Sequence, residues 1–87
     1  MLNTNWEKVE EADGKSYLIR AFNFKNFIDA FAFMTKVALL AEKMNHHPDW
    51  ANVYNKVVIK LSTHDEGYTV TAKDLALSEM INQIKIQ

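Results

Sequence analysis

The chain has 87 residues, 48% of them hydrophobic, and a formal net charge of −1. This length and composition predict one small domain over residues 1–87 with a single modest core, and they exclude a disordered chain. The absence of cysteine excludes disulfides, thiolate metal sites and cysteine nucleophiles. A charge near zero, without a local cluster of Lys and Arg, argues against direct binding of nucleic acid.

The first half of the chain predicts a β-hairpin followed by a long helix. Strands are expected over residues 6–10 and 17–24, on either side of the turn dipeptide Asp13-Gly14. From residue 26 to about residue 45 the apolar residues recur at helical spacing, which predicts an amphipathic helix that covers a sheet. The expected core stripe consists of Phe27, Phe31, Met34, Val37, Ala38, Leu40, Ala41 and Met44.

The middle of the chain alternates between apolar and polar residues, which predicts one long strand over residues 52–61. Its apolar face is expected to consist of Val53, Val57, Ile59 and Leu61. Tyr54, on the other parity, is expected to pack on a sheet face. Gly67 marks a loop, and a short fourth strand is expected over residues 68–70.

The C-terminal segment predicts a second helix. Thr71 is expected to be its N-cap, with Asp74 as a variant of the capping box. Its apolar face is expected to consist of Leu77, Met80, Ile81 and Ile84. The order ββαββα predicts an α+β fold, a two-layer sandwich in which a four-stranded antiparallel sheet carries both helices on one face.

Two observations concern the cellular location. Residues 1–6 lack the basic and apolar regions of a signal peptide. The most apolar segment, residues 27–41, is too short to span a bilayer and is interrupted by Asp29 and Lys36. A cytoplasmic protein without membrane contact is therefore expected.

All three histidines of the chain, His46, His47 and His64, fall within residues 42–74 together with Glu42 and Asp74. Imidazole titrates close to neutral pH, so three histidines that converge on one cleft could both donate and accept protons. Taken singly, each of these residues also has a structural interpretation. Glu42 and His46 have the spacing of a surface pair on a helix, and His47 precedes the helix-stopping proline. His64 could be a polar loop residue, and Asp74 a helix cap.

The complete pattern, Glu-x3-His-His-Pro-x5-Tyr-x9-His-x9-Asp-Leu over residues 42–75, resembles the signature of the pterin-4a-carbinolamine dehydratase family. The similarity covers residues 17–82 and includes the Phe-x-Phe at 22–24 and the aromatic run at 31–34. Residues 65–70 replace a segment that usually contains paired glycines in the family. They are also one residue longer than the commonest form of that segment. The shape of the loop beside His64 is therefore expected to differ.

The resemblance implies a hydro-lyase that recycles the pterin cofactor of aromatic amino acid hydroxylases. Its substrate would be 4a-hydroxytetrahydropterin, which an aromatic amino acid hydroxylase leaves behind, and its products quinonoid dihydropterin and water. No metal and no organic cofactor are expected, because elimination of water involves no redox change. The partners implied are the pterin substrate and, functionally, such a hydroxylase.

The resemblance also implies roles for individual residues. His47 and His64 would transfer protons, His46 would orient the substrate, and Glu42 would tune His46. Trp50 would lie beside the pocket, and the backbone of residues 62–63 would bond to the pyrimidine edge of the pterin. The substrate-binding residues implied in this way are Glu42, Trp50, Ser62, Thr63 and Asp74.

Two other classes of function stay open. Three histidines and two carboxylates could bind zinc in a hydrolase or a structural site, although helix-borne zinc pairs use i, i+4 spacing rather than adjacent histidines. An interaction protein is the third class, because animal members of the family also act as dimerisation cofactors of a homeodomain transcription factor. Nothing in the sequence argues for that role.

The long helix carries apolar residues that the core does not need. Ile28, Ala32 and Leu39 project away from Met34 and Ala41 and would form an apolar patch. The resemblance implies dimers and tetramers, the latter formed by packing of these long helices. A homo-oligomer with Leu39 near a subunit contact is therefore expected.

Overall fold

The computed structural model describes residues 5–85. Residues 1–4, on which most of the signal-peptide expectation rests, lie outside this range, as do residues 86–87. The strands are β1 (Glu7–Glu10), β2 (Ser16–Asn23), β3 (Asp49–Val53) and β4 (Lys56–Leu61). The helices are α1 (Phe27–Met44), the 3-10 turn η1 (His64–Glu66) and α2 (Ala72–Asn82).

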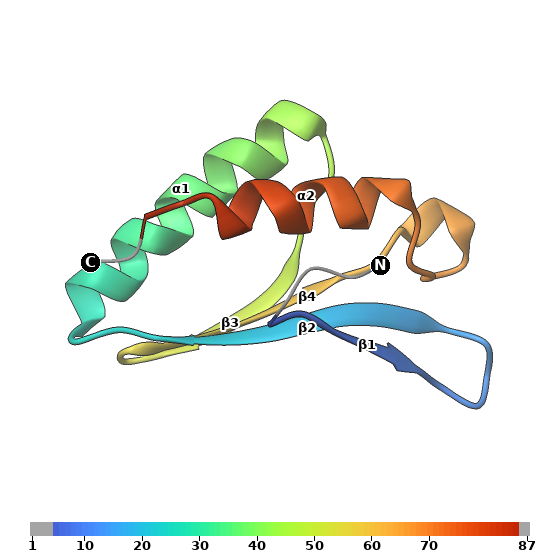
Figure 1. Ribbon diagram of the computed structural model, residues 1–87, viewed down its shortest axis with the longest axis horizontal. Helices are drawn as coiled ribbons and strands as arrows, with labels where there is room; N and C mark the ends of the chain where they lie inside the picture. Colours follow the sequence, from blue (N-terminus) through green and yellow to red (C-terminus); the bar gives the residue numbers. More distant parts are fainter. Residues whose placement is uncertain (1–4, 86–87) are drawn as a thin grey trace.

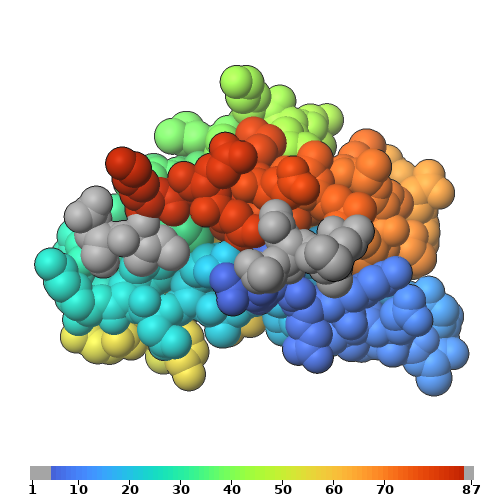
Figure 2. Space-filling view, viewed as in Figure 1, coloured from blue at the N-terminus to red at the C-terminus, as the bar shows by residue number. Residues whose placement is uncertain are grey.

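The four strands form one antiparallel sheet in the order β1-β2-β4-β3. Both α-helices lie on one side of this sheet, with α1 running obliquely to α2 (Figure 1). Figure 2 shows the two layers in contact from the same side, with the blue β1–β2 hairpin along the lower edge. The predicted α+β two-layer fold is confirmed. No helix within residues 5–85 is long and apolar enough to cross a membrane.

The prediction of one strand over residues 52–61 was wrong, because a tight turn divides this segment between β3 and β4. Val53 pairs with Lys56, and Tyr54 between them has a left-handed φ of 51°. The side-chain amide of Asn52 donates to the carbonyl oxygens of Tyr54 and Lys56 and closes the turn. The turn reverses the parity of the alternation, so Val53 is 74% exposed and Tyr54 packs on no sheet face.

The predicted strand over residues 68–70 was also wrong. Thr69 forms a single bridge to Thr63 and belongs to no strand. The sheet still has four strands, because residues 49–61 form two of them, β3 and β4. Before this bridge the chain makes the turn η1, which ends at Gly67 with a φ of 72°. Tyr68 follows in the same left-handed region, with a φ of 62°. Two successive left-handed residues break the extended conformation that a strand requires.

Helix α1 covers the sheet with a face rotated from the predicted one. Its buried residues are Ala30, Phe33, Val37 and Ala41, and Met34, Leu40 and Met44 pack partly against the core. The prediction was wrong for Phe27, Phe31 and Ala38, which are exposed. Phe33 lies 4.7 Å from Phe22 and 5.0 Å from Phe24 between ring centroids, so the aromatic residues of β2 and its continuation select the buried face.

Helix α2 begins as predicted. The Thr71 side chain accepts from the N–H of Lys73, and the Asp74 side chain accepts from the N–H of Thr71, which completes the capping box. Leu77 and Ile81 are fully buried beneath it. The predicted apolar face is therefore confirmed at Leu77 and Ile81.

The other end of α2 is held to the sheet by Asn82. Its Oδ1 accepts from Trp6 Nε1 at 2.7 Å and from Arg20 Nη1 at 2.6 Å. Burial lowers the pKa of the Arg20 guanidinium from its ordinary value. These bonds hold α2 in register along the sheet.

Candidate active site

Three separate segments of the chain line a cavity of about 240 Å³. Residues 45–47 follow α1, residues 62–65 follow β4, and Lys73 lies in the first turn of α2. The cavity is lined by Asn45, His46, His47, Ser62, Thr63, His64, Asp65 and Lys73. All three histidines of the sequence motif therefore meet in one place.

The end of α1 determines how the first two histidines point. Asn45 takes a left-handed conformation with a φ of 53°, which asparagine tolerates well, and its N–H donates to the carbonyl oxygens of Ala41 and Glu42. The N–H of His46 also donates to the Ala41 carbonyl, at 3.0 Å. Pro48 then prevents further helix, and β3 begins at Asp49. Both histidines therefore lie beyond the helix rather than on its surface.

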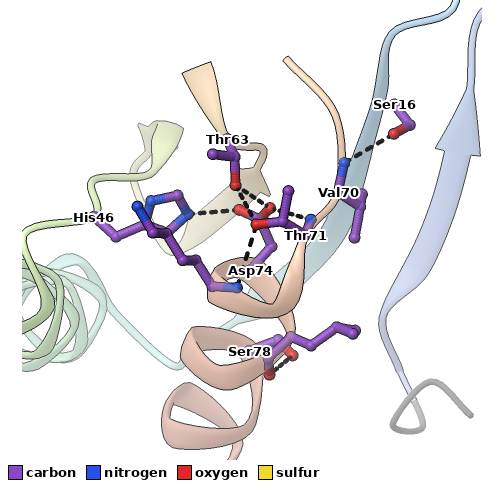
Figure 3. A network of polar contacts seen from close by, with 9 residues as sticks. Ser16, His46, Thr63, Val70, Thr71, Asp74 and Ser78 are labelled. Carbon is purple, nitrogen blue, oxygen red and sulfur yellow. Dashed lines mark hydrogen bonds and ion pairs between the residues drawn. The ribbon is translucent and has the colours of Figure 1, made fainter. Parts of the chain in front are cut away.

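His46 is held by a buried carboxylate. Its residue is 8% exposed, and Nε2 lies 2.6 Å from Oδ1 of Asp74, which is 0% exposed. The other oxygen of Asp74 accepts from Thr63 Oγ1 at 2.8 Å and from the Thr71 N–H at 2.9 Å (Figure 3). With Nε2–H donating to the carboxylate, the ring orientation and tautomer of His46 are set and Nδ1 stays outside this bond.

His47 is paired with Glu42 on the exposed side of the site. Its Nε2 lies 2.8 Å from Glu42 Oε1, and the two side chains are 59% and 80% exposed. The expectation that Glu42 tunes His46 was wrong, because the left-handed turn at Asn45 carries His46 away from the helix surface. The carboxylate therefore contacts the next histidine along the chain.

His64 enters the cavity from the opposite segment, at the start of η1. Its side chain is 74% exposed, and Nδ1 lies 3.4 Å from Asp65 Oδ1. The ring of Tyr68 meets the imidazole edge to face, with centroids 4.8 Å apart and an interplanar angle of 86°. A second cavity of about 290 Å³ adjoins the first, and His47, Ser62 and His64 line both.

Ser62 and Thr63 line the same cavity as the histidines. The Thr63 N–H donates to the Thr69 carbonyl, and the Thr63 carbonyl accepts from the N–H groups of Glu66 and Tyr68. The backbone of Thr63 is thus occupied within the loop. Ser62 Oγ, by contrast, is buried and has no partner among the described residues. Rotation about χ1 of Ser62 would present a donor and an acceptor to the cavity.

The sequence profile of the family described as "Pterin 4 alpha carbinolamine dehydratase" matches residues 1–84. The chain belongs to this family. A relative from Afipia carboxidovorans, provisionally named a pterin-4-alpha-carbinolamine dehydratase, is 55% identical over 74 residues, which cover 85% of this chain and 73% of the relative. The resemblance inferred from the histidine motif is confirmed.

Two solved structures share this fold. A transcriptional coactivator/pterin dehydratase from Brucella melitensis matches with a TM-score of 0.80 and 44% identity, over 91% of this chain and 80% of that chain. A pterin dehydratase-like protein described as a RuBisCO assembly factor in the alpha-carboxysome has a TM-score of 0.74 but 18% identity, over 92% of this chain and 88% of that chain. The second likeness shows a shared fold and carries no inference about activity.

Two residues implied by the family pattern lie away from the histidine cavity. Asp74 is fully buried behind it and contacts His46, Thr63 and Thr71 instead of lining the space. Trp50 is half-buried in β3, where it packs against the core and lines neither cavity that contains histidines. Asp74 can therefore act on a ligand through His46.

The sequence pattern missed three residues that line the cavity, namely Asn45, Asp65 and Lys73. Each directly precedes or follows a residue of the family motif, and this adjacency is the signal that could have identified them. Lys73 brings a cation to a cavity whose other charged lining group is the carboxylate of Asp65.

The geometry of the titratable groups bears on metal binding. Within residues 5–85, no three His, Asp or Glu side chains are grouped so that they could hold a metal ion. His46 and His47 each direct Nε2 at a different carboxylate, Asp74 and Glu42 respectively. The imidazoles of His46 and His47 therefore belong to two separate carboxylate pairs and not to a shared ligand set.

Proposed function

We propose that this chain dehydrates 4a-hydroxytetrahydropterin to quinonoid dihydropterin and water by histidine acid/base catalysis. The observation that carries the proposal is the convergence of His46, His47 and His64 on one cavity in a member of this family. In the reaction the C4a–O bond breaks, the hydroxyl leaves as water after taking up a proton, and N5 loses a proton as the C4a–N5 double bond forms. One acid and one base are therefore needed.

His47 and His64 meet this requirement best. Both are largely exposed, both line the two adjoining cavities, and they come from different segments, so they can approach the pterin from different sides. One of them protonates the leaving hydroxyl and the other removes the N5 proton. Because the proton given up balances the proton taken, the enzyme returns to its starting state after exchange with water.

His46 has a different role in this proposal. Its buried Nε2 is committed to Asp74, and the ring is fixed by a network that includes Thr63. A ring held this rigidly orients the pterin through its free nitrogen. Ser62 Oγ, the buried hydroxyl without a partner among the described residues, supplies a further polar contact.

The test is an assay of dehydration with freshly generated carbinolamine. His47→Ala and His64→Ala should each lower the enzyme-dependent rate by about 10²- to 10⁴-fold. Because both side chains are exposed, the melting temperature should stay close to that of the wild type. His46→Ala should raise KM more than it lowers kcat. A folded His64→Ala variant with the wild-type rate would exclude this residue from proton transfer.

We also propose that an aromatic amino acid hydroxylase produces the carbinolamine that this chain dehydrates. We further propose that the chain forms homo-oligomers through α1. The outer face of this helix includes Phe27 and Phe31 in addition to the predicted Ile28 and Leu39. Ile28 is 70% exposed, Leu39 68%, Phe31 55% and Phe27 44%. Large apolar side chains aligned in this way on one exposed helix face are typical of a packing surface.

A further inference from the structure

The loop that carries His64 has few hydrogen bonds to the rest of the molecule. It comprises residues 64–70, between β4 and α2. Most of its hydrogen bonds close the loop on itself or on Thr63, which precedes it. Within residues 5–85, its other hydrogen bonds all go to one residue, Ser16 in β2. The loop is therefore hydrogen-bonded to the sheet through Ser16.

Ser16 holds the loop with both its backbone and its side chain. Its N–H donates to the Tyr68 carbonyl at 2.9 Å. Its Oγ accepts from the Val70 N–H, also at 2.9 Å (Figure 3). Ser16 is 8% exposed, so water competes little for these bonds. Because the two bonds act on residues 68 and 70, they fix both the position and the direction of this segment.

The register of the sheet explains why the contact forms at Ser16. The pairing of β2 with β4 ends at Leu18 and Leu61, where β4 itself ends. At the start of β2, two residues before Leu18, this edge of the strand has no strand beside it. The loop takes that place and satisfies the N–H of Ser16, which a buried backbone donor requires.

The loop needs such a hold because its backbone is strained. Gly67 has a φ of 72° and Tyr68 a φ of 62°, both in the left-handed region. Glycine adopts this conformation readily, whereas a residue with a side chain does so at a cost. A conformation of this kind persists only where the surrounding contacts fix it. The bonds to Ser16 act at Tyr68 and two residues beyond it, which is where the strain lies.

Tyr68 lies between Ser16 and His64. Its ring meets the His64 imidazole edge to face, with centroids 4.8 Å apart, and its N–H donates to the carbonyl of Thr63. The His64 side chain is itself 74% exposed, and its Nδ1 lies 3.4 Å from Oδ1 of the neighbouring Asp65. A contact this long and exposed restrains the ring weakly. The direction of the imidazole therefore depends on the loop.

We infer that Ser16 is a positioning residue, which holds the loop at residues 68–70 so that His64 can transfer a proton in the dehydration. The inference rests on the proposed function and on the role proposed there for His64. Within residues 5–85, no hydrogen bond joins Ser16 to any of the three histidines, so Ser16 acts through the loop.

The test is the steady-state kinetics of carbinolamine dehydration by variants of Ser16. Ser16→Ala removes the acceptor of the Val70 N–H, whereas Ser16→Thr keeps a hydroxyl and suits a strand. Ser16→Ala should lower kcat by about 3- to 10-fold, which corresponds to the loss of one hydrogen bond. It should change KM by less than about twofold, since His46 and its network stay in place. Ser16→Thr should restore kcat to within about twofold of the wild type.

A double variant distinguishes positioning from a general loss of structure. If Ser16 acts through His64, adding Ser16→Ala to His64→Ala should change the residual enzyme-dependent rate by less than about twofold. Independent effects would multiply instead.

Ser78→Ala is the matched control, because it also removes one hydroxyl bond from a buried serine. This bond goes to the Leu75 carbonyl within α2, away from the loop. The control should leave kcat and KM within about twofold of the wild type. Ser16→Cys keeps the shape and a weak acceptor, so it should lower kcat by less than Ser16→Ala does. This variant serves in place of Ser16→Ala if the alanine variant does not fold.

NMR without substrate tests the positioning separately from the activity. In Ser16→Ala the Val70 amide should exchange with solvent at least about threefold faster, because it has lost its acceptor. The imidazole resonances of His64 should shift, and those of His46 should not. If the wild type dehydrates no carbinolamine, the proposed function fails, and the His64 resonances decide whether Ser16 positions this ring.

Four results would each overturn the inference. They are an unchanged kcat in Ser16→Ala, losses that multiply in the double variant, an equal loss in Ser78→Ala, and unchanged His64 resonances in Ser16→Ala.

Discussion

Replacing Asp74 by alanine removes the acceptor at the centre of the buried network. Asp74 accepts from His46 Nε2, Thr63 Oγ1 and the Thr71 N–H, and it is 0% exposed. Thr63 Oγ1 keeps an alternative partner in Thr71 Oγ1, 2.6 Å away, so two donors lose theirs. A buried donor without a partner costs about 1–3 kcal/mol, and the free energy of unfolding should therefore fall by about 2–6 kcal/mol.

Thermal denaturation followed by circular dichroism measures this loss. For a domain of this size, 1 kcal/mol corresponds to about 4–8 °C, so the melting temperature of Asp74→Ala should fall by at least about 8 °C. Glu79→Ala is the matched control, because Glu79 is an exposed acidic residue on the same helix. It should change the free energy of unfolding by less than about 0.5 kcal/mol.

Asp74→Asn separates the positioning role from stability. The amide has nearly the same shape, and its oxygen can still accept from the Thr71 N–H while its NH₂ faces His46 Nε2. His46 must then accept at Nε2 and carry its proton on Nδ1. Imidazole ¹⁵N NMR should detect this change of tautomer, and KM should rise. An Asp74→Ala melting temperature within about 2 °C of the wild type, or an unchanged His46 tautomer in Asp74→Asn, would refute the reasoning.

Three further predictions concern other parts of the molecule. Glu42→Gln should shift the imidazole resonances of His47 and leave those of His46 unchanged, and the reverse result would show that Glu42 contacts His46 in solution. Activity should survive exhaustive chelation, whereas stoichiometric zinc in the pure protein, with activity lost on its removal, would support the metal-site alternative. Leu39→Glu should reduce the molar mass measured by light scattering, because Leu39 is 68% exposed on the apolar face of α1. A wild type that is monomeric at micromolar concentration would contradict the oligomer proposal, and so would an unaltered mass in the variant.

The features that sequence alone determined are those that depend on near neighbours. The helical spacing predicted α1, and Thr71 followed three residues later by Asp74 predicted the start of α2, because capping uses backbone groups within one turn. The histidine motif indicated the family and the three histidines that meet in the cavity. The hairpin of β3 and β4 was not predicted, because apolar and polar residues alternate on both sides of the tight turn at Tyr54. The alternation therefore gave no sign that one strand ended there and another began.

Tertiary contacts decided the rest of the site. His46 and Asp74 are 28 residues apart, so their hydrogen bond depends on the packing of α2 beside the end of α1, which no local pattern encodes. The spacing of Glu42 and His46 predicted a pair only on the assumption that the helix continued, and the left-handed Asn45 ended it. The second cavity likewise exists only where Tyr17 in β2, Lys60 in β4 and the loop at Tyr68 are brought together by the sheet. Pairing between distant segments is set by the free energy of the whole packed fold, and for this reason it became visible only in the structure.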